Sequence, residues 1–297
     1  MTPEELKKWR EAGKIAAQAL EYGRTLIRKG SSMREVCDLV DAKIVDLGAK
    51  PAWPTQIANN AIAAHWTPDA DDETLFDQEL VCLDVGAHVD GYIGDNALTV
   101  DLSGKWTNLV KASRDALAQA SKLLAPGTLI ADIGKTIQET IESHGFVPVR
   151  NLSGHGISRF VIHDEPGIPN HKTTSMNKIQ KDQIIAIEPF ATNGQGLIGE
   201  ATSCNVYALV SERPVRSPFA REVLAFVEQH YGPLPFTTRW IGKALGIGKA
   251  KLGIRELVAA GAVMSHPPLV EVSKGMVTVE EKTFYVGEKT EVLTKSE

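Results

Sequence analysis

The sequence predicts an α+β fold in which one large domain carries an inserted helical subdomain. Two β-rich runs surround Asp90-Gly91, a dipeptide typical of tight turns between antiparallel strands. Segments with helical periodicity precede and follow this hairpin. Residues 211–270 are helical with little strand, and a strand pattern returns at 276–287. An all-helical block between strands indicates an insertion. We therefore expect one domain of residues 1–210 and 271–297, and a second of residues 211–270.

The first third of the chain predicts two helices and the hairpin. Residues 3–29 are amphipathic, with Ile15 and Leu20 on the apolar stripe. A second helix is expected over 32–47, with Ser31 or Ser32 as its N-cap and Gly48 after its end. The stretch 51–72 is rich in Pro, Asn and Asp, so we expect it to be mostly loop. The strand pattern over 79–101 then predicts the hairpin.

The remaining segments alternate helix and strand patterns. Outside the insertion we expect helices at 108–124 and 129–144, strands at 146–152, 183–187, 203–210 and 276–287, and a loop at 153–181. Inside the insertion we expect helices at 217–230, 237–245 and 249–260.

Composition excludes several classes of protein. The chain has 297 residues and a net charge of −5, which argues against a protein whose main task is to coat nucleic acid. Its three cysteines are widely spaced without a CxxC pair, so neither a disulfide framework nor a thiolate zinc site is expected. The polar N-terminal segment is no signal peptide, and no run of 18 apolar residues occurs. We therefore expect a cytoplasmic protein with no membrane partner.

The hairpin contains two aspartates that can converge. If Asp90-Gly91 is a two-residue turn, Asp84 lies opposite Ala97 and Asp95 lies diagonal to Asp84 on the same face. Diagonal neighbours are roughly 7–8 Å apart, a gap that side chains can close. Two carboxylates among apolar residues repel each other unless a cation lies between them. The alternative is that one of them points to solvent.

Two glutamates follow apolar strand patterns. Glu188 ends the run Ile184–Ile187, and a buried carboxylate there requires a partner, which a cation, a helix N-terminus or an arginine could supply. In the last strand pattern, Glu281 shares a face with Val277 and Val279. Glu280 lies on the opposite face, so we expect Glu281 to point inward and Glu280 to be a solvated surface charge.

The histidines complete a candidate site. His155 lies between two glycines, His163 follows eight residues later, and His65 follows a loop. A single histidine is more often a surface or core residue than a ligand. Together, however, two aspartates, two glutamates and one histidine would form an oxygen-rich site for two cations, a set that suits Mn, Fe(II), Co or Zn.

This pattern resembles the methionine aminopeptidases, whose fold is the pita-bread fold of prolidase and creatinase, with pseudo-two-fold halves. The family's five metal ligands follow the order Asp, Asp, His, Glu, Glu. The matching residues lie in Leu83-Asp-Val-Gly86, Gly94-Asp-Asn96, Gly154-His-Gly156, Ile187-Glu-Pro-Phe190 and Glu281-Lys-Thr283. The spacing of eleven positions between Asp84 and Asp95 is the family's own. Further similarity covers Asn60–His65, Thr67-Pro68, Asn151–His155, Ile162-His163 and Ile168–Asn170, so the motifs span residues 50–290.

The insertion resembles that of type II members, and the lack of a long N-terminal extension resembles the archaeal form. Six basic residues against two acidic ones in 236–275 are similar to a winged-helix module, although a solvated helical face has the same composition. One residue departs from the family: Lys282 stands where a histidine is usual. By strand parity Lys282 points away from the metals, so we expect activity to survive.

The resemblance implies a methionyl aminopeptidase that removes the initiator methionine from nascent proteins with a small second residue. A hydroxide bridging two divalent ions (Co, Mn, Fe(II) or Zn) would attack the scissile carbonyl. A monomer with at most transient ribosome contact is expected. The implied roles are metal binding by Asp84, Asp95, His155, Glu188 and Glu281, proton transfer by Glu188, oxyanion stabilisation by His163, positioning of the peptide nitrogen by His65, and a methionine slot formed by Trp53, Ile162 and His163.

Two other functions are compatible with the pattern. A prolidase-like enzyme that cleaves X-Pro bonds shares the fold, but such enzymes generally have an extra N-terminal domain for which 297 residues leave no room. A non-catalytic factor associated with ribosomes or nucleic acid is the second alternative. It would have to keep all five metal-binding residues without using them.

Overall fold

The computed structural model describes residues 1–211 and 213–296. The helices are α1 (Pro3–Leu26), α2 (Met33–Asp46), α3 (Thr107–Leu123), α4 (Ile130–Ser143), α5 (Pro218–His230), α6 (Thr238–Leu245) and α7 (Ile247–Ala260). The strands of the N-terminal half are β1 (Lys50–Pro51), β2 (Gln56–Asn59), β3 (Ile62–Ala64), β4 (Leu80–Val89) and β5 (Tyr92–Asp101). Those that follow are β6 (Val147–Pro148), β7 (Ser153–Ser158), β8 (Val161–Pro169), β9 (Gln183–Ile187), β10 (Phe190–Thr192), β11 (Ile198–Glu200), β12 (Val206–Leu209), β13 (Phe236–Thr237), β14 (Val263–Ser265), β15 (Leu269–Glu271), β16 (Val277–Val279), β17 (Lys282–Val286) and β18 (Thr290–Val292).

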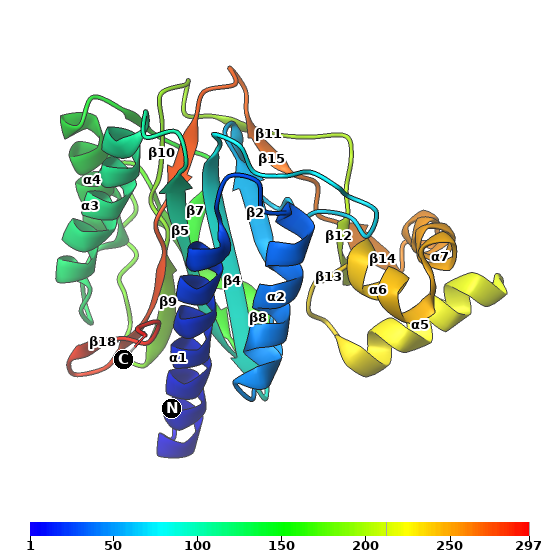
Figure 1. The fold of residues 1–297 in the computed structure, drawn as a ribbon. Helices are drawn as coiled ribbons and strands as arrows, with labels where there is room; N and C mark the ends of the chain where they lie inside the picture. Colours follow the sequence, from blue (N-terminus) through cyan, green and yellow to red (C-terminus); the bar gives the residue numbers. More distant parts are fainter. Residues whose placement is uncertain (212, 297) are drawn as a thin grey trace.

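Two halves repeat the same order of elements, a pair of helices followed by a β-hairpin. The first half contains α1, α2 and the β4–β5 hairpin, and the second contains α3, α4 and the β7–β8 hairpin. Helices α1 and α2 lie in front of the strands, while α3 and α4 lie at their side against β10 and β16 (Figure 1). The paired halves, with antiparallel sheets between their helices, confirm the predicted pita-bread fold.

Helix α1 lies directly against the β4–β5 hairpin. Thr2 caps its first turn in a capping box with Glu5, and Pro3 occupies the first helical position, where no backbone N–H is needed. Ile15 and Leu20 are buried on the side of the helix that faces the strands. A Cβ added to Gly94 of β5 would lie only 2.5 Å from the Cα of Gly13. Because neither residue has a side chain, the helix can approach the strand that carries Asp95.

The predicted hairpin register is confirmed. Asp84 pairs with Ala97, Gly86 pairs with Asp95, and Val89 pairs with Tyr92 across the turn. Asp90 and Gly91 have φ values of 53° and 84°, the two positive values that a tight hairpin turn requires. The turn therefore sets the register that brings the two aspartates to the same face of the sheet.

Both glutamates of the candidate site lie where the chain passes from one sheet to another. Strands β9 and β17 pair in the five-stranded sheet, whereas β10 and β16 pair in a three-stranded sheet. Glu188 lies in the gap between β9 and β10, and Glu281 lies in the gap between β16 and β17. Neither glutamate belongs to a strand, so its side chain does not have to follow the alternation of a sheet. It can therefore turn into the space between the sheets.

Threonine hydroxyls connect these gaps to β5. The hydroxyl of Thr99 donates to the carbonyl of Val279 at 2.7 Å and accepts from the N–H of Val279 at 2.9 Å. The hydroxyl of Thr283 does the same for Asp95, donating to its carbonyl at 2.7 Å and accepting from its N–H at 3.0 Å. These hydroxyls satisfy backbone groups on both sides of the interruption at 280–281, where a continuous strand was predicted over 276–287.

The segment 51–72 is mostly loop, as predicted, although it contains two short strands, whereas the loop prediction for 153–181 is wrong in part. The first segment contains β2 and β3, and the second contains β7 and β8. Strand β8 lies at the edge of its sheet and alternates poorly between exposed and buried residues, because much of it faces solvent. The strands predicted at 146–152 and 203–210 are shorter in the structure than expected. The other predicted helices and strands are present.

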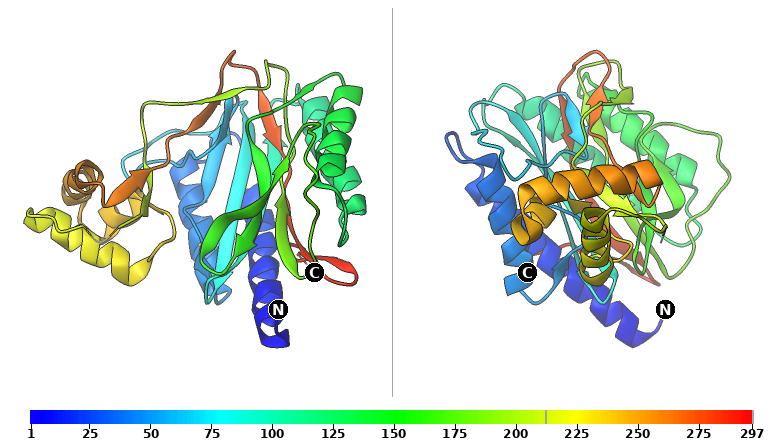
Figure 2. Two further views of the ribbon diagram at one scale, coloured as in Figure 1. Left: turned by 180° about the vertical axis from the view of Figure 1, so that it is seen from behind. Right: turned by 90° about the vertical axis from the view of Figure 1, so that its right-hand side faces the viewer.

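Helices α5, α6 and α7 pack with β12, β13 and β14 around a hydrophobic core of their own that includes Val223, Phe236 and Ile254. This part projects to one side of the molecule (Figures 1 and 2). It is attached to α2 through Arg239, which is fully buried and pairs with Asp38 and Asp41. The predicted domain division at 211–270 and its winged-helix character remain predictions, and Glu212 lies outside the described residues. No helix among the described residues has the length and apolarity needed to span a membrane.

Candidate metal centre and substrate cavity

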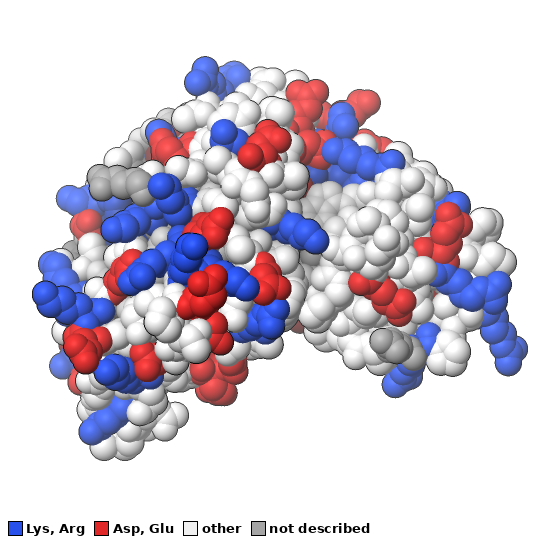
Figure 3. Space-filling view, turned by 90° about the horizontal axis from the view of Figure 1, so that it is seen from below, with Lys and Arg blue, Asp and Glu red and all other residues white. Residues whose placement is uncertain are grey.

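A cavity of about 330 Å³ lies between the strands of both halves and the part that carries α5–α7. Viewed from below, the molecule is hollowed between its larger portion and this projecting part (Figure 3). Strands β4, β5, β8 and β12 supply residues to the cavity, as do the gaps that hold Glu188 and Glu281. Both halves and the projecting part therefore contribute to one space.

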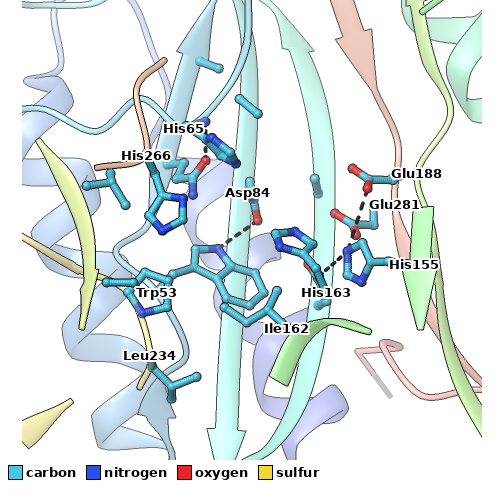
Figure 4. A pocket seen from close by; sticks show the side chains of 18 of the residues that line it. Trp53, His65, Asp84, His155, Ile162, His163, Glu188, Leu234, His266 and Glu281 are labelled. Carbon is cyan, nitrogen blue, oxygen red and sulfur yellow. Dashed lines mark hydrogen bonds and ion pairs between the residues drawn. The ribbon is translucent and has the colours of Figure 1, made fainter. Parts of the chain in front are cut away.

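Three side chains approach each other closely at one end of the cavity. Asp95, His155 and Glu281 are buried, and each offers a ligand atom within 4.8 Å of those of the others. Nε2 of His155 lies 3.6 Å from Asp95 and 3.8 Å from Oε1 of Glu188 (Figure 4). Asp84, on β4, lines the same cavity, and its carboxylate meets the indole of Trp53 (Figure 4).

The acidic groups of this cluster destabilise each other's charged forms. Burial raises the pKa of Asp84 to about 7. Burial and the charge of Asp84 raise the pKa of Asp95 well above its ordinary value. Burial, then the charges of Asp95 and Asp84, do the same to the pKa of Glu188. The pKa of Glu281 is likewise raised, first by burial and then by the surrounding carboxylates.

This set of donors fits divalent cations. Without a cation the four buried carboxylates favour their protonated forms, whereas cations would allow all four to ionise. Burial and the neighbouring His163 lower the pKa of His155 to about 3, so its imidazole is neutral and able to coordinate. Four carboxylates and one neutral imidazole are an oxygen-rich set, suited to Mn, Fe(II), Co or Zn.

Three further histidines surround the cavity. The rings of His155 and His163 meet edge to face with centroids 4.5 Å apart, so His163 lies beside the metal-binding group. The rings of His65 and His266 are 5.9 Å apart in the same manner. Burial, followed by the neighbouring rings of His266 and His163, lowers the pKa of His65 to about 4. At neutral pH His65 is thus uncharged, which suits a hydrogen bond to a peptide group.

The backbone of His65 has an unusual conformation. Its φ of 62° lies in the left-handed region, which a residue with a side chain seldom adopts. Its N–H donates a hydrogen bond of 2.7 Å to Oε1 of Gln56 on β2. Strained residues that the surroundings hold in place are common at functional sites, and here the conformation directs the ring toward the cavity (Figure 4).

An apolar section of the cavity lies beside the acidic cluster. Trp53 and Ile162 lie near each other there, with Leu234 below them (Figure 4). The indole Nε1 of Trp53 donates a hydrogen bond of 3.1 Å to Oδ1 of Asp84. Phe190 and Val206 also line the cavity and are buried. A flexible apolar side chain could therefore lie next to the carboxylates.

The residues singled out from the sequence line this one cavity. They are Trp53, His65, Asp84, Asp95, His155, Ile162, His163, Glu188 and Glu281. Their roles remain predictions. Glu281 points inward as expected, but the expectation of a solvated Glu280 is wrong: it is only partly exposed, and burial raises its pKa. Glu280 lies between β16 and β17, and the charges of Lys282 and Arg114 act on its carboxylate.

Sequence reasoning missed Gln56, Leu234 and His266 as lining residues. Gln56 lies in a segment predicted as mostly loop. Leu234 has no charged or reactive group, so its sequence position gives no sign of a role in a site. His266 stands directly before two prolines at the end of a strand pattern. A histidine fixed by such a stiff segment was the available signal.

Comparison with known proteins identifies the family of the chain. Residues 7–212 match the sequence profile of Metallopeptidase family M24. The methionine aminopeptidase of Archaeoglobus fulgidus is 44% identical over 287 residues, which cover 96% of this chain and 97% of that protein. The solved methionine aminopeptidase of Thermotoga maritima is 26% identical, with a TM-score of 0.73 over 99% of this chain and 98% of that one.

Two more distant structures share the fold alone. A thermophilic Arx1 is 15% identical with a TM-score of 0.86, covering 99% of this chain and 91% of that one. The prolidase of Pyrococcus furiosus is 19% identical with a TM-score of 0.64, and the match covers all of this chain but 65% of the prolidase. Since the family profile matches more than half of the chain and the archaeal relative is similar along nearly its whole length, the chain belongs to metallopeptidase family M24 and, within it, to the methionine aminopeptidases.

Proposed function

We propose that this protein removes the N-terminal methionine from newly made polypeptides whose second residue is small. The observation that carries the proposal is the close approach of Asp95, His155 and Glu281 at one end of a cavity whose adjoining wall is apolar, with Glu188 3.8 Å from His155 and Asp84 lining the same cavity. A methionine side chain is flexible and apolar, and it would lie against Trp53 and Ile162. Its amino group and its carbonyl would then lie at the carboxylates.

We infer that two divalent ions are held by the five residues Asp84, Asp95, His155, Glu188 and Glu281. The donor chemistry supports this inference because four mutually repelling carboxylates need more than one positive charge to ionise together. When bound, such ions lower the pKa of a water molecule and polarise the scissile carbonyl. The candidate ions are Mn, Fe(II), Co and Zn.

We assign to Glu188 the transfer of protons during peptide hydrolysis. Its raised pKa means that it accepts a proton more readily than an ordinary carboxylate does. It would take a proton from the attacking water and deliver it to the leaving amine. The neutral rings of His163 and His65 would donate hydrogen bonds, His163 to the carbonyl oxygen as charge develops and His65 to the peptide group.

The prolidase-like alternative is less well supported. The archaeal methionine aminopeptidase is similar along nearly its whole length, whereas this chain matches 65% of the prolidase structure. A non-catalytic role would leave a complete set of metal-binding side chains without a use. We therefore keep aminopeptidase activity as the proposal. Contact with the ribosome and a cytoplasmic location remain expectations from the sequence.

A panel of short peptides tests the proposed substrate. With metal supplied, release of the first residue is expected from Met-Ala-Ser, is expected to be slow from Met-Leu-Ser, and is expected to be absent from Ala-Pro-Ser. Chromatography of the free amino acid measures each rate. Cleavage of Ala-Pro-Ser in preference to Met-Ala-Ser would replace the proposal with the prolidase-like function.

A further inference from the structure

The contact between Trp53 and Asp84 joins the apolar section of the cavity to the acidic cluster. Nε1 of Trp53 is 3.1 Å from Oδ1 of Asp84. Among the described residues, it is the hydrogen-bond donor that reaches this carboxylate. An indole N–H is uncharged and can only donate. It therefore orients one carboxylate oxygen without neutralising the group, and it leaves the other oxygen free to face the cavity.

The chain around Trp53 holds the indole in this place. Strand β1 pairs with β4, Lys50 with His88 and Pro51 with Ala87. The N–H of Ala52 then donates to the carbonyl of Gly86 at 2.9 Å. The backbone immediately before Trp53 is thus tied to the strand that carries Asp84.

Gly86 provides the space that the indole occupies. Asp84, Gly86 and His88 share one face of β4 because side chains alternate along a strand. A Cβ added to Gly86 would lie 2.3 Å from the six-membered ring of Trp53. The indole therefore lies directly on the strand backbone, with its N–H beside Asp84. Trp53 is 5% exposed, so water competes little for this hydrogen bond.

We propose that Trp53 is a positioning residue for the metal site, whose indole N–H fixes the Asp84 carboxylate while its ring forms the wall for the substrate's methionine. This inference rests on the proposed function, because it assigns Asp84 to the metals. Groups that hydrogen-bond to metal-binding side chains orient them and raise metal affinity, typically by about 10–100-fold. The same side chain would therefore contact the substrate's methionine and orient a metal-binding carboxylate.

Substitutions at Trp53 separate its two roles. Trp53→Phe keeps an aromatic wall and removes the donor, so the metal-depleted chain should bind Mn²⁺ roughly tenfold more weakly in a calorimetric titration. At saturating Mn²⁺ it should raise the KM for Met-Ala-Ser less than a variant without an aromatic ring does. Trp53→Gln keeps an N–H donor and removes the ring. It should retain Mn²⁺ affinity and raise KM.

Trp240 offers a matched control. Its Nε1 also donates to an aspartate, Oδ2 of Asp41, at 2.8 Å, and it lies outside the cavity lining formed by the described residues. Trp240→Phe therefore loses the same kind of hydrogen bond and should bind Mn²⁺ as the native chain does. If Trp53→Phe does not fold, as judged by circular dichroism, the comparison of Trp53→Gln with Trp53→Leu carries the test, because only glutamine offers a donor.

Equal Mn²⁺ affinity in Trp53→Phe and the native chain would overturn the inference, as would an equal loss in Trp240→Phe. Failure of the native chain itself to bind Mn²⁺ would instead contradict the proposed function. The two failures are therefore distinguishable, because metal binding is measured without any peptide.

Discussion

Nε2 of His155 lies 3.6 Å from Oδ2 of Asp95, yet the surroundings favour the uncharged form of both groups. Burial lowers the pKa of His155 to about 3, whereas burial and the charge of Asp84 raise the pKa of Asp95. Both shifts therefore oppose the formation of an ion pair between these two side chains in the absence of cations. Cations would displace protons from the carboxylates and leave the imidazole neutral, so binding of metal and release of protons are linked.

This linkage predicts that the metal-free protein loses stability as pH rises above 6.5. The raised pKa values of the four carboxylates mean that the folded chain holds more protons than the unfolded chain, so ionisation on going to higher pH favours unfolding. His155 and His65 have the opposite effect, because their pKa values are lowered, but this effect fades above pH 6.5, the ordinary histidine value, as the imidazoles of the unfolded chain lose their protons.

Thermal melts at pH 6.5 and at about pH 8.5 measure this effect. The melting temperature of the chelator-treated protein should fall between the two pH values, by about 2–4 °C for each kcal/mol lost. The Mn²⁺-loaded protein should show little change. A metal-free protein whose stability rises over this interval would contradict the arrangement of the four carboxylates.

Glu281 and Glu280 should differ sharply in their effect on metal binding. Glu281 is 4% exposed and belongs to the close group with Asp95 and His155, whereas Glu280 faces Lys282 and Arg114. Glu281→Gln removes one negative charge from the site, so Mn²⁺ affinity should fall by at least about tenfold. Glu280→Gln should leave it unchanged. Calorimetry on both variants distinguishes them, and weaker binding in Glu280→Gln alone would reverse the assignment.

Glu188→Gln should reduce kcat more than it reduces metal affinity. The amide has nearly the same shape but cannot carry protons, and general acid–base catalysis typically contributes about 10²–10⁴-fold. Steady-state kinetics on Met-Ala-Ser at saturating Mn²⁺ gives the effect on kcat. If this variant keeps native kcat, proton transfer belongs to another group.

Arg239 should anchor the part that carries α5–α7 to the rest of the chain. Its guanidinium is fully buried between Asp38 and Asp41 and reaches Thr67 at 3.3 Å. Arg239→Met leaves a buried aspartate without its partner, which costs about 3–5 kcal/mol. Lys243→Met removes a largely exposed partner of the same Asp38 and should cost about 1 kcal/mol or less. Chemical denaturation compares the two, and equal losses would contradict the anchoring role.

The sequence predicts the site better than it predicts the sheets. The pairing of Asp84 with Ala97 follows from one turn dipeptide, because two residues with positive φ fix the register of the whole hairpin. The sequence predicts a loop where β7 and β8 lie. Their glycines and exposed residues interrupt the alternation of apolar and polar side chains that indicates a strand. These strands nevertheless carry His155 and His163, which were identified by their flanking motifs alone.

The interruption at Glu280–Glu281 has no local signal, and His266 has only the two prolines that follow it. Val279, the last residue of β16, pairs with Phe190 and also exchanges two hydrogen bonds with the hydroxyl of Thr99, which lies far away in the sequence. His266 reaches the cavity because β14 pairs with β12, and its Nε2 is buried with no partner among the described residues. Both features depend on contacts between distant segments, which periodicity and motifs do not encode.

The most direct test of the account is methionine release from Met-Ala-Ser by the chelator-treated protein as Mn²⁺ is added back. The account predicts no release without metal, and recovery that reaches its plateau as two ions bind per chain, with no recovery in Glu188→Gln. Methionine release that persists after complete metal removal, or its absence although two Mn²⁺ ions bind, would contradict the claim that this site is the active centre of an aminopeptidase.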